Sequence, residues 1–120
     1  MWNTPKDSEL AKMPKLYATE GTPLDEKLIY EHFFIGASDW LAAEFSPEER
    51  IFFGYAILNG DLEMSEWGYI SFDELKEIKV PLKVNGIPIG YAEVERESGW
   101  QPKQFSDCMA EYRMKHCIKD

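Results

Sequence analysis

The chain has few of the residues that support catalysis, metal binding or covalent cross-linking. Its 120 residues include two histidines and two cysteines. They form no CxxC pair, no HExxH motif and no glycine-rich phosphate loop, so the sequence predicts neither a structural zinc site nor a nucleotide-binding fold. We therefore expect no cofactor and no bound metal.

Long apolar runs and a disulfide framework are also missing. No apolar segment approaches the roughly 20 residues that span a bilayer, and the first residues lack the apolar core of a signal peptide. Cys108 and Cys117 lie nine residues apart in one expected helix, hence on opposite faces, and cannot pair with each other. These features predict a cytoplasmic protein in a reducing compartment, without membrane contact.

Basic residues are scarce. The 13 lysines and arginines face 22 acidic residues, which gives a net charge of −9. Phosphate backbones and anionic membranes need clustered basic side chains, so we expect no direct binding to nucleic acid or to a membrane. The charge is compatible with a basic protein partner, with a cation or with simple solubility. No pattern in the sequence specifies the oligomeric state.

What the chain does contain is enough apolar material for one core. Hydrophobic residues make up 44% of the chain and aromatic residues 14%. Residues 1–120 are therefore expected to form a single α+β domain, with the polar segment 1–26 packed on it. We expect a mostly antiparallel sheet of about five or six strands with short N-terminal, central and C-terminal helices. The simplest arrangement places these helices on one face of the sheet.

Apolar patterning and turn residues locate the elements. Strands are expected at 28–35, 39–45, 51–58 and 67–72, and helices at 8–13, 72–78 and 105–118. The segment 51–58, IFFGYAIL, is apolar throughout, which is typical of a central strand buried on both faces. Gly54 within it indicates a bulge or a close approach of another backbone.

Asn85-Gly86 is the strongest turn signal in the chain. It predicts a two-residue type I′ hairpin within residues 79–95, at the sheet margin or protruding from it. The two-residue turn implies four cross-strand pairs, which are Val84–Ile87, Lys83–Pro88, Leu82–Ile89 and Pro81–Gly90. Pro81 and Pro88 would then block further strand pairing on both outer edges.

The densest group of polar and aromatic residues surrounds the turn in LNGDLEMSEWGYISF (58–72). Trp67 and Tyr69 alternate in phase on the expected strand and so share a face. With Asn59, Asp61 and Glu66 they predict a binding pocket with an aromatic floor and an acidic rim. The alternative is a core tryptophan and tyrosine beneath a polar loop.

His32 is the second candidate position. It lies in an aromatic strand and is followed by Phe33 and Phe34, and Asp39 opens the following strand. The strand-end carboxylates Asp39, Glu44, Asp61 and Glu66 could bind a divalent cation or support acid/base hydrolysis if two of them converge. Together with Asp39, Asp61 and Glu66, His32 would suit a general base or a metal ligand of a small hydrolase. The alternative is a partly buried strand histidine with a hydrogen-bond partner. No catalytic residue is assigned, and we expect both cysteines to serve helix packing.

Several stretches in order resemble a bacterial family. These are MPKLY (13–17), PLDEKLIY (23–30), HFFIGASDW (32–40), FFGYAILNGD (52–61), EWGYISFDELKEIKV (66–80) and GWQPK (99–103). The chain is similar to the family known as domain of unknown function 2958. The resemblance implies a short cytoplasmic protein of plasmids, integrative elements and phages, with no established activity. The hairpin PLKVNGIPIGYAEV carries the least of the resemblance and is expected to be this protein's own feature.

These observations favour a non-enzymatic accessory protein of a mobile element that binds another macromolecule. A specific version is an anti-defence inhibitor of a nuclease or CRISPR system, whose acidic side chains occupy the groove of a basic, nucleic-acid-binding host protein. Two alternatives remain. One is a small metal-dependent or acid/base hydrolase built on His32, and the other is a nucleic-acid-binding module with stacking aromatic side chains.

Overall fold

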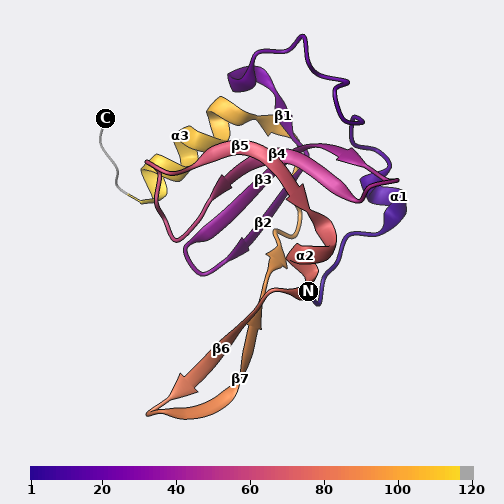
Figure 1. Cartoon of the computed structure of the whole chain (residues 1–120). Helices are drawn as coiled ribbons and strands as arrows, with labels where there is room; N and C mark the ends of the chain where they lie inside the picture. The colour runs from indigo at the N-terminus through magenta and orange to yellow at the C-terminus, as the bar shows by residue number, and fades with distance from the viewer. Residues whose placement is uncertain (117–120) are drawn as a thin grey trace.

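A central antiparallel sheet organises the fold. The computed structural model describes residues 1–116, so Cys117 and the end of the helix expected to reach residue 118 lie outside the described residues. The sheet has five strands in the order β5-β4-β3-β2-β8 (Figure 1). Their bounds are β2 Glu31–Ile35, β3 Ser38–Ser46, β4 Ile51–Ile57, β5 Glu66–Ser71 and β8 Glu95–Arg96. The α+β class expected from the sequence is confirmed.

A second, two-stranded sheet leads into the C-terminal helix. It pairs β1, Leu28–Ile29, with β9, Lys103–Gln104. The chain runs from β1 almost directly into β2, and the Tyr30 backbone N–H donates to the Ala42 carbonyl on β3 at 2.9 Å. The pairing places the start of the last helix beside the central sheet.

Helices cover both faces of the central sheet. On one face α1, Asp7–Leu10, and α2, Phe72–Glu77, enclose a core that includes Phe33 and Phe52. On the other face α3, Phe105–Lys115, packs through Phe105, Cys108 and Met109. The expectation that helices lie on one face is therefore wrong. The physical reason is that β3 and β4 carry apolar side chains on both faces, and each face needs a cover.

The helix after β5 begins as its sequence predicts. Ser71 precedes α2, and its side-chain oxygen accepts a hydrogen bond from the Glu74 backbone N–H at 3.1 Å. Phe72 and Leu75 from this helix are buried in the core. The cap thus fixes the angle at which α2 folds back on the sheet. No helix within residues 1–116 is long and apolar enough to cross a membrane.

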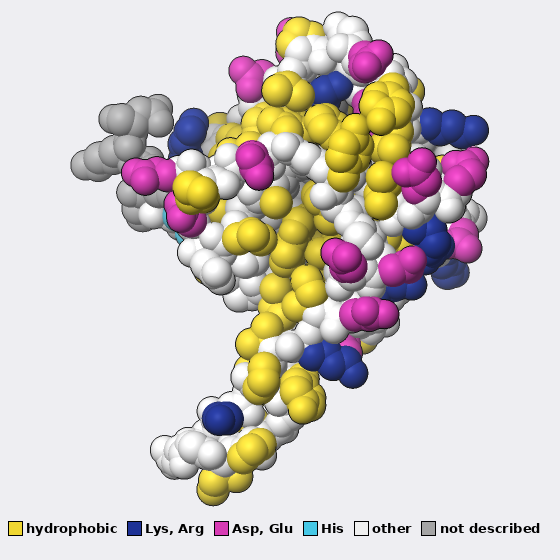
Figure 2. Space-filling model, in the orientation of Figure 1, with side chains coloured by type: hydrophobic (Ala, Val, Ile, Leu, Met, Phe, Trp, Pro, Cys, Tyr) yellow, Lys and Arg dark blue, Asp and Glu magenta, His cyan; other side chains and the backbone are white. Residues whose placement is uncertain are grey.

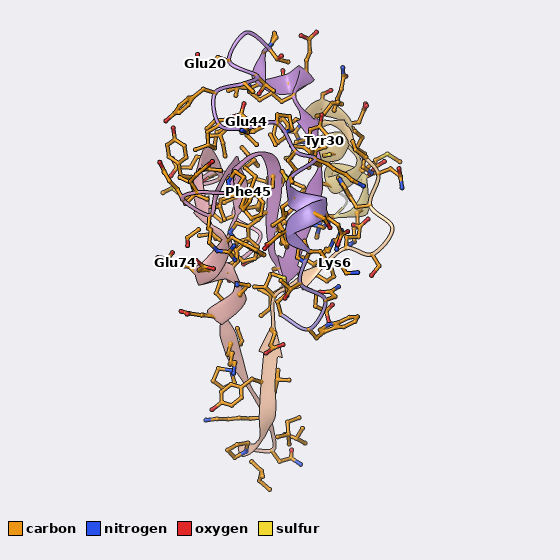
Figure 3. The ribbon with its side chains drawn as sticks, turned by 90° about the vertical axis from the view of Figure 1, so that its right-hand side faces the viewer. Lys6, Glu20, Tyr30, Glu44, Phe45 and Glu74 are labelled. Carbon is orange, nitrogen blue, oxygen red and sulfur yellow. The ribbon has the colours of Figure 1, made fainter. Side chains whose placement is uncertain are left out.

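A β-hairpin, here called the arm, projects from the body of the molecule (Figures 1 and 3). It consists of β6, Lys79–Val84, and β7, Ile87–Glu93, which form a sheet of their own. Its turn has positive φ at both central residues, 52° at Asn85 and 79° at Gly86, as a type I′ turn requires.

The register of the arm departs from the expected one beyond the second pair. Val84–Ile87 and Lys83–Pro88 pair as predicted, but the next pairs are Leu82–Gly90 and Pro81–Tyr91. The register shifts because β7 contains an extra residue at Ile89. Gly90 follows it with a φ of 133°, a conformation that favours glycine. The two pairs predicted beyond Lys83–Pro88 are therefore wrong.

Candidate functional site

An ion pair is buried almost completely between the central sheet and the loop that contains Thr19. The side chains of Lys27 and Glu44 are 5% and 4% exposed, and Lys27 Nζ lies 3.8 Å from a Glu44 carboxylate oxygen. Moving two charges out of water is costly unless additional hydrogen bonds compensate. Such a pair therefore needs partners in the surrounding chain.

The loop after Tyr17 supplies those partners. Lys27 Nζ donates to the Thr19 carbonyl oxygen and, at 2.7 Å, to Thr19 Oγ1. Glu44 accepts from the backbone N–H of Tyr17 at 2.9 Å, from that of Thr19 at 3.1 Å, and from the Thr19 hydroxyl. The pair thus holds the loop against the sheet, and the loop provides the hydrogen bonds that the two buried charges need.

Two irregular backbone positions make this contact possible. Strand β3 is bulged between Ala42 and Glu44, and beyond the bulge Glu44 pairs with Phe53 and shares its face. Tyr17 has a φ of 70°, which lies in the left-handed region and costs about 1–3 kcal/mol for a residue other than glycine. The hydrogen bond from Tyr17 to Glu44 offsets that cost and fixes the direction of the loop.

Loop and sheet enclose a cavity of about 460 Å³, here called the loop cavity. Figure 3 shows Glu20 out on the loop and Glu44 on the strand beneath it. A volume of this size is ordinary for a small-molecule site, for which about 300–1,000 Å³ is typical. The cavity is lined by Tyr17, Glu20, Thr22, Pro23, Leu24, Lys27, Glu44, Phe53 and Tyr69.

The mouth of the loop cavity is electrostatically negative. The hydroxyl groups of Tyr17 and Tyr69 lie 3.1 Å apart. This hydrogen bond raises the pKa of Tyr69, and partial burial and the charges of Glu44 and Glu20 raise it further. Within residues 1–116 the Glu20 carboxylate has no hydrogen-bond or ion-pair partner.

The predicted pocket around Trp67 and Tyr69 divides between the core and the loop cavity. The two side chains share a face of β5, as expected. Trp67 is half-buried, stacked on Phe53 at a centroid distance of 5.4 Å and close to Phe105 of α3. Tyr69 is exposed and lines the loop cavity. Trp67 therefore supports the cavity from behind, and Tyr69 forms part of its wall.

The acidic residues predicted as a rim lie elsewhere. Asp61 accepts backbone hydrogen bonds from Glu63 and Met64 and so stabilises its own turn. Asn59 has a φ of 53° and donates its backbone N–H to Ser38 Oγ at 3.0 Å. Glu66 is exposed at the start of β5. None of these three acidic or amide side chains lines the loop cavity.

His32 and Asp39 do come together. His32 Nε2 lies 2.7 Å from Asp39 Oδ1, and His32 Nδ1 lies 2.9 Å from Glu97 Oε1. The ring also contacts Trp100, at a centroid distance of 5.4 Å, beside a cavity of about 110 Å³. A carboxylate only accepts, so both contacts are hydrogen bonds when both ring nitrogens carry hydrogen. In this arrangement neither nitrogen is free for a substrate proton or a metal ion.

The hydrolase alternative requires four groups to converge, and the structure brings two of them together. Asp61 and Glu66 do not line the cavity beside His32. No group of three or more His, Cys, Asp or Glu side chains within residues 1–116 is arranged to hold a metal ion. Cys108 is buried in α3, and burial raises the pKa of its thiol to about 11, which makes it a packing residue.

Sequence reasoning missed Lys27 and named Glu44 only as a strand-end carboxylate, although each residue carries a further signal. Glu44 interrupts the apolar run WLAAEF, and Lys27 directly precedes Leu28 and Ile29. A charged residue inside an apolar strand is either turned outward or buried with a partner. The pairing itself is invisible in the sequence because it depends on the bulge in β3.

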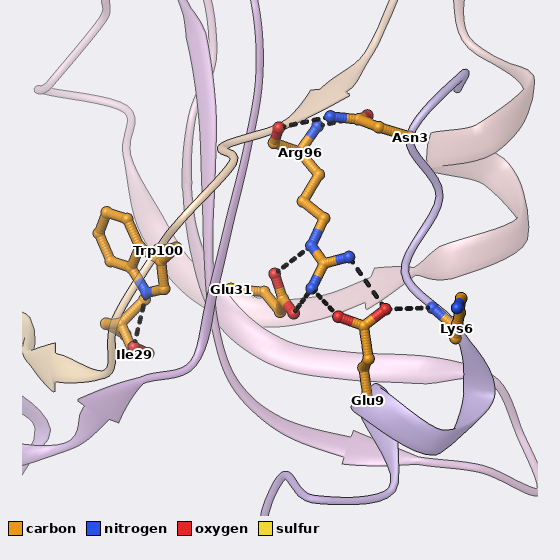
Figure 4. Close-up of polar contacts among 7 residues, drawn as sticks. All are labelled: Asn3, Lys6, Glu9, Ile29, Glu31, Arg96 and Trp100. Atoms are coloured by element: carbon orange, nitrogen blue, oxygen red, sulfur yellow. Dashed lines mark hydrogen bonds and ion pairs between the residues drawn. The ribbon is translucent and has the colours of Figure 1, made fainter.

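A second polar cluster anchors the base of the arm (Figure 4). Arg96, three residues after the arm, bridges two carboxylates: its Nε and Nη2 atoms each lie 3.1 Å from Glu31, and its Nη1 atom lies 3.2 Å from Glu9. Asn3 exchanges two hydrogen bonds with the Arg96 backbone, at 2.7 Å and 3.0 Å. The N-terminal segment is thereby fixed to the strand that returns from the arm.

Replacing Arg96 with methionine is expected to lower the free energy of unfolding by about 2–4 kcal/mol at pH 7, because Glu31 would stay buried without a counter-charge. Burial raises the pKa of Glu31, Arg96 opposes that rise, and hydrogen bonding to Arg96 helps lower the pKa of Glu9 to about 2. In the variant, the ionised Glu31 destabilises the fold at pH values above its raised pKa. This destabilisation disappears as the pH falls toward 4.5, the usual pKa of a glutamate, because Glu31 then becomes protonated.

The difference between wild type and variant should therefore be smaller near pH 4.5 than at pH 7. Urea unfolding at both pH values measures it, with the exposed Lys12→Met as the matched control. Equal differences at both pH values would show that Glu31 does not depend on Arg96 for its charge.

Comparison with known proteins gives one family match. The family model described as "Protein of unknown function (DUF2958)" matches residues 17–103. That range contains every residue that lines the loop cavity, and it contains the whole arm. No curated protein and no solved structure matches the chain.

Proposed function

Because the chain belongs to the DUF2958 family, whose description assigns no activity, we propose a function from its own surface: it binds a partner protein through the arm. The observation that carries this proposal is an apolar face of the arm that no other element within residues 1–116 covers. By the observed register, Val80, Leu82, Val84 and Ile87 lie on that face. Their side chains are between 41% and 65% exposed.

The arm is poorly explained as an isolated structural element. A two-stranded hairpin is marginally stable in water on its own. Figure 2 shows hydrophobic side chains running along the arm toward the body. Contiguous exposed apolar surface of this kind marks sites of protein interaction. A partner that covers the apolar face would stabilise the arm and remove that surface from water.

The prolines indicate how the partner binds. Pro81 and Pro88 lie one on each strand of the arm and have no backbone N–H to donate. Neither edge of the arm therefore offers a complete row of donors and acceptors for strand addition. The partner is expected to pack on the apolar face rather than extend the sheet.

The arm and the body of the molecule differ in charge, so they favour different surfaces on a partner. Lys79 and Lys83 are the charged residues between positions 79 and 92, whereas the whole chain has a net charge of −9. In Figure 2 acidic side chains spread over the body. A fitting partner has an apolar groove for the arm and a basic patch for the body.

The more specific parts of the proposal follow from the charge and the family resemblance. A basic, nucleic-acid-binding host protein would meet the acidic body, and the chain would then act as an anti-defence inhibitor for a plasmid, phage or integrative element. The buried free thiol of Cys108 agrees with a reducing, cytoplasmic location.

Photo-crosslinking tests the proposal in living host cells. A photo-reactive residue at Ile87, on the apolar face of the arm, is expected to give a covalent adduct with one partner protein. The matched control carries the same group at Met64, which is 77% exposed on the body. Replacing Val84 and Ile87 with threonine keeps the strand preference and should reduce capture of that partner by about tenfold or more.

Absence of an adduct at Ile87, or the same adducts at Ile87 and Met64, would contradict binding through the arm. Adducts with a second copy of the chain would show that the arm mediates self-association and does not bind a different protein. A salt series separates the contribution of the body. Capture that weakens between about 0.05 and 0.5 M salt supports the basic partner, and capture unaffected by salt contradicts it.

A further inference from the structure

We propose that the loop cavity binds an organic cation, meaning an ammonium or guanidinium group that carries apolar substituents. Glu20 and Glu44, which line the cavity, lie toward the end of the molecule opposite the arm (Figure 3). The proposal is therefore independent of the partner protein proposed above. It rests on three features of the cavity: its aromatic walls, its unpaired carboxylate and its internally neutralised lysine.

Aromatic rings form the walls. Phe53 and Tyr69 lie with their centroids 5.8 Å apart at an interplanar angle of 60°, and Tyr17 joins them through its hydroxyl group. Trp67 stacks behind Phe53 and keeps the ring in place. The faces of such rings carry negative electrostatic potential and attract cations. Lys27 Nζ already lies 6.0 Å from the centroid of Phe53, so this wall accommodates an ammonium group.

The charges in the cavity leave a negative excess. The charge of Lys27 is balanced by Glu44, and the hydrogen bonds of both side chains go to the loop. Glu20 stands at the rim, and its carboxylate has no partner within residues 1–116. A ligand cation would therefore lie toward Glu20 and the tyrosine rings, away from Lys27.

The remaining wall is apolar, which selects among cations. Pro23 and Leu24 line the cavity, and Leu24 is 45% exposed. A bare metal ion would gain nothing from these side chains, whereas methyl or methylene groups on a cation would displace water from them. An anion is disfavoured because it would approach Glu20 and Glu44. A substituted ammonium or guanidinium group can contact the aromatic rings, the carboxylate of Glu20 and the apolar side chains of Pro23 and Leu24 at the same time.

The test compares choline with its neutral isostere 3,3-dimethylbutan-1-ol, using the whole chain and its backbone amide NMR signals. Choline is expected to bind with a Kd of about 1–10 mM, as suits so small a ligand, and to shift the signals of Thr19, Lys27 and Tyr69. The signals of the arm should not move. The isostere should bind at least about tenfold more weakly, because it has the same shape without the charge.

Variants separate charge from shape. Glu20→Gln, at an exposed position that folding does not require, should weaken choline binding by about fivefold, whereas Glu77→Gln on the exposed side of α2 should leave it unchanged. Tyr69→Leu, which removes one of the tyrosine rings, should weaken it as well. The proposal is overturned if choline shifts none of the cavity signals, if the isostere binds as tightly as choline, or if Glu20→Gln binds like the wild type.

Discussion

Replacing Lys27 with methionine is expected to lower the free energy of unfolding by about 3–5 kcal/mol, the cost of removing one partner from a buried ion pair. The side chain of Glu44 is 4% exposed, so its carboxylate would lie in the interior without a neighbouring cation. A domain of 120 residues has a total stability of roughly 6–18 kcal/mol at the usual value per residue. The substitution therefore removes a large share of it, and the melting temperature should fall by roughly 10–25 °C.

A double variant identifies the unpaired charge as the cause. Lys27→Met combined with Glu44→Gln removes both charges of the pair, so it should recover part of the lost stability, which thermal and urea unfolding both measure. The exposed Lys15→Met, in the same loop, is the matched control and should change stability by less than about 0.5 kcal/mol. A double variant that is less stable than Lys27→Met would show that Glu44 is stabilised by the loop amides rather than by the lysine.

The same pair explains why the candidate site was hard to find in the sequence. The 16 positions between Lys27 and Glu44 hold β1, β2, a turn and most of β3. Their contact requires β3 to pair with β2, the bulge to rotate Glu44 onto the face of Phe53, and the loop to turn back at Tyr17. The local propensities of these residues predict none of these three features. Each one depends on tertiary contacts that override local preference.

Features encoded by neighbouring residues were predictable. The hairpin between β2 and β3, the cap of α2 at Ser71 and the type I′ turn at Asn85 all depend on a few adjacent side chains. The shared face of Trp67 and Tyr69 also follows from strand periodicity alone. Which of the two is buried does not, because that is decided by Phe105 of α3, which packs on Trp67.

The two candidate surfaces differ in how the sequence encodes them. The arm is local: its turn, its prolines and its alternating apolar residues lie within one continuous segment, and only the bulge at Ile89 escaped prediction. The loop cavity is assembled from the N-terminal loop and three different strands. Periodicity can therefore reveal a projecting hairpin, but a cavity of this kind becomes visible only in the folded chain.

The close packing of β3 and β4 leads to the last prediction: Gly54→Ala should destabilise the domain by about 3 kcal/mol or more, the upper range for overpacking a core. A Cβ atom at Gly54 would lie 2.3 Å from the Leu41 carbonyl oxygen and 3.0 Å from the Ala42 Cα atom. Both are backbone atoms of the neighbouring strand, so no side-chain rotation relieves the overlap. The strands must separate beside the bulge that positions Glu44.

Gly68 provides the matched control because it pairs with Gly54 across β4 and β5, and a Cβ atom there meets nothing within 4 Å. Gly68→Ala should therefore change stability by less than about 1 kcal/mol, since it alters strand propensity without a clash. Urea unfolding of both variants measures the difference. Two equally stable variants would mean that β3 moves away from Gly54 at little cost, and the bulge would then be flexible. If the overlap is instead decisive, Gly54→Ala should also shift the amide signals of Tyr17 and Thr19, because their hydrogen bonds to Glu44 depend on the bulge.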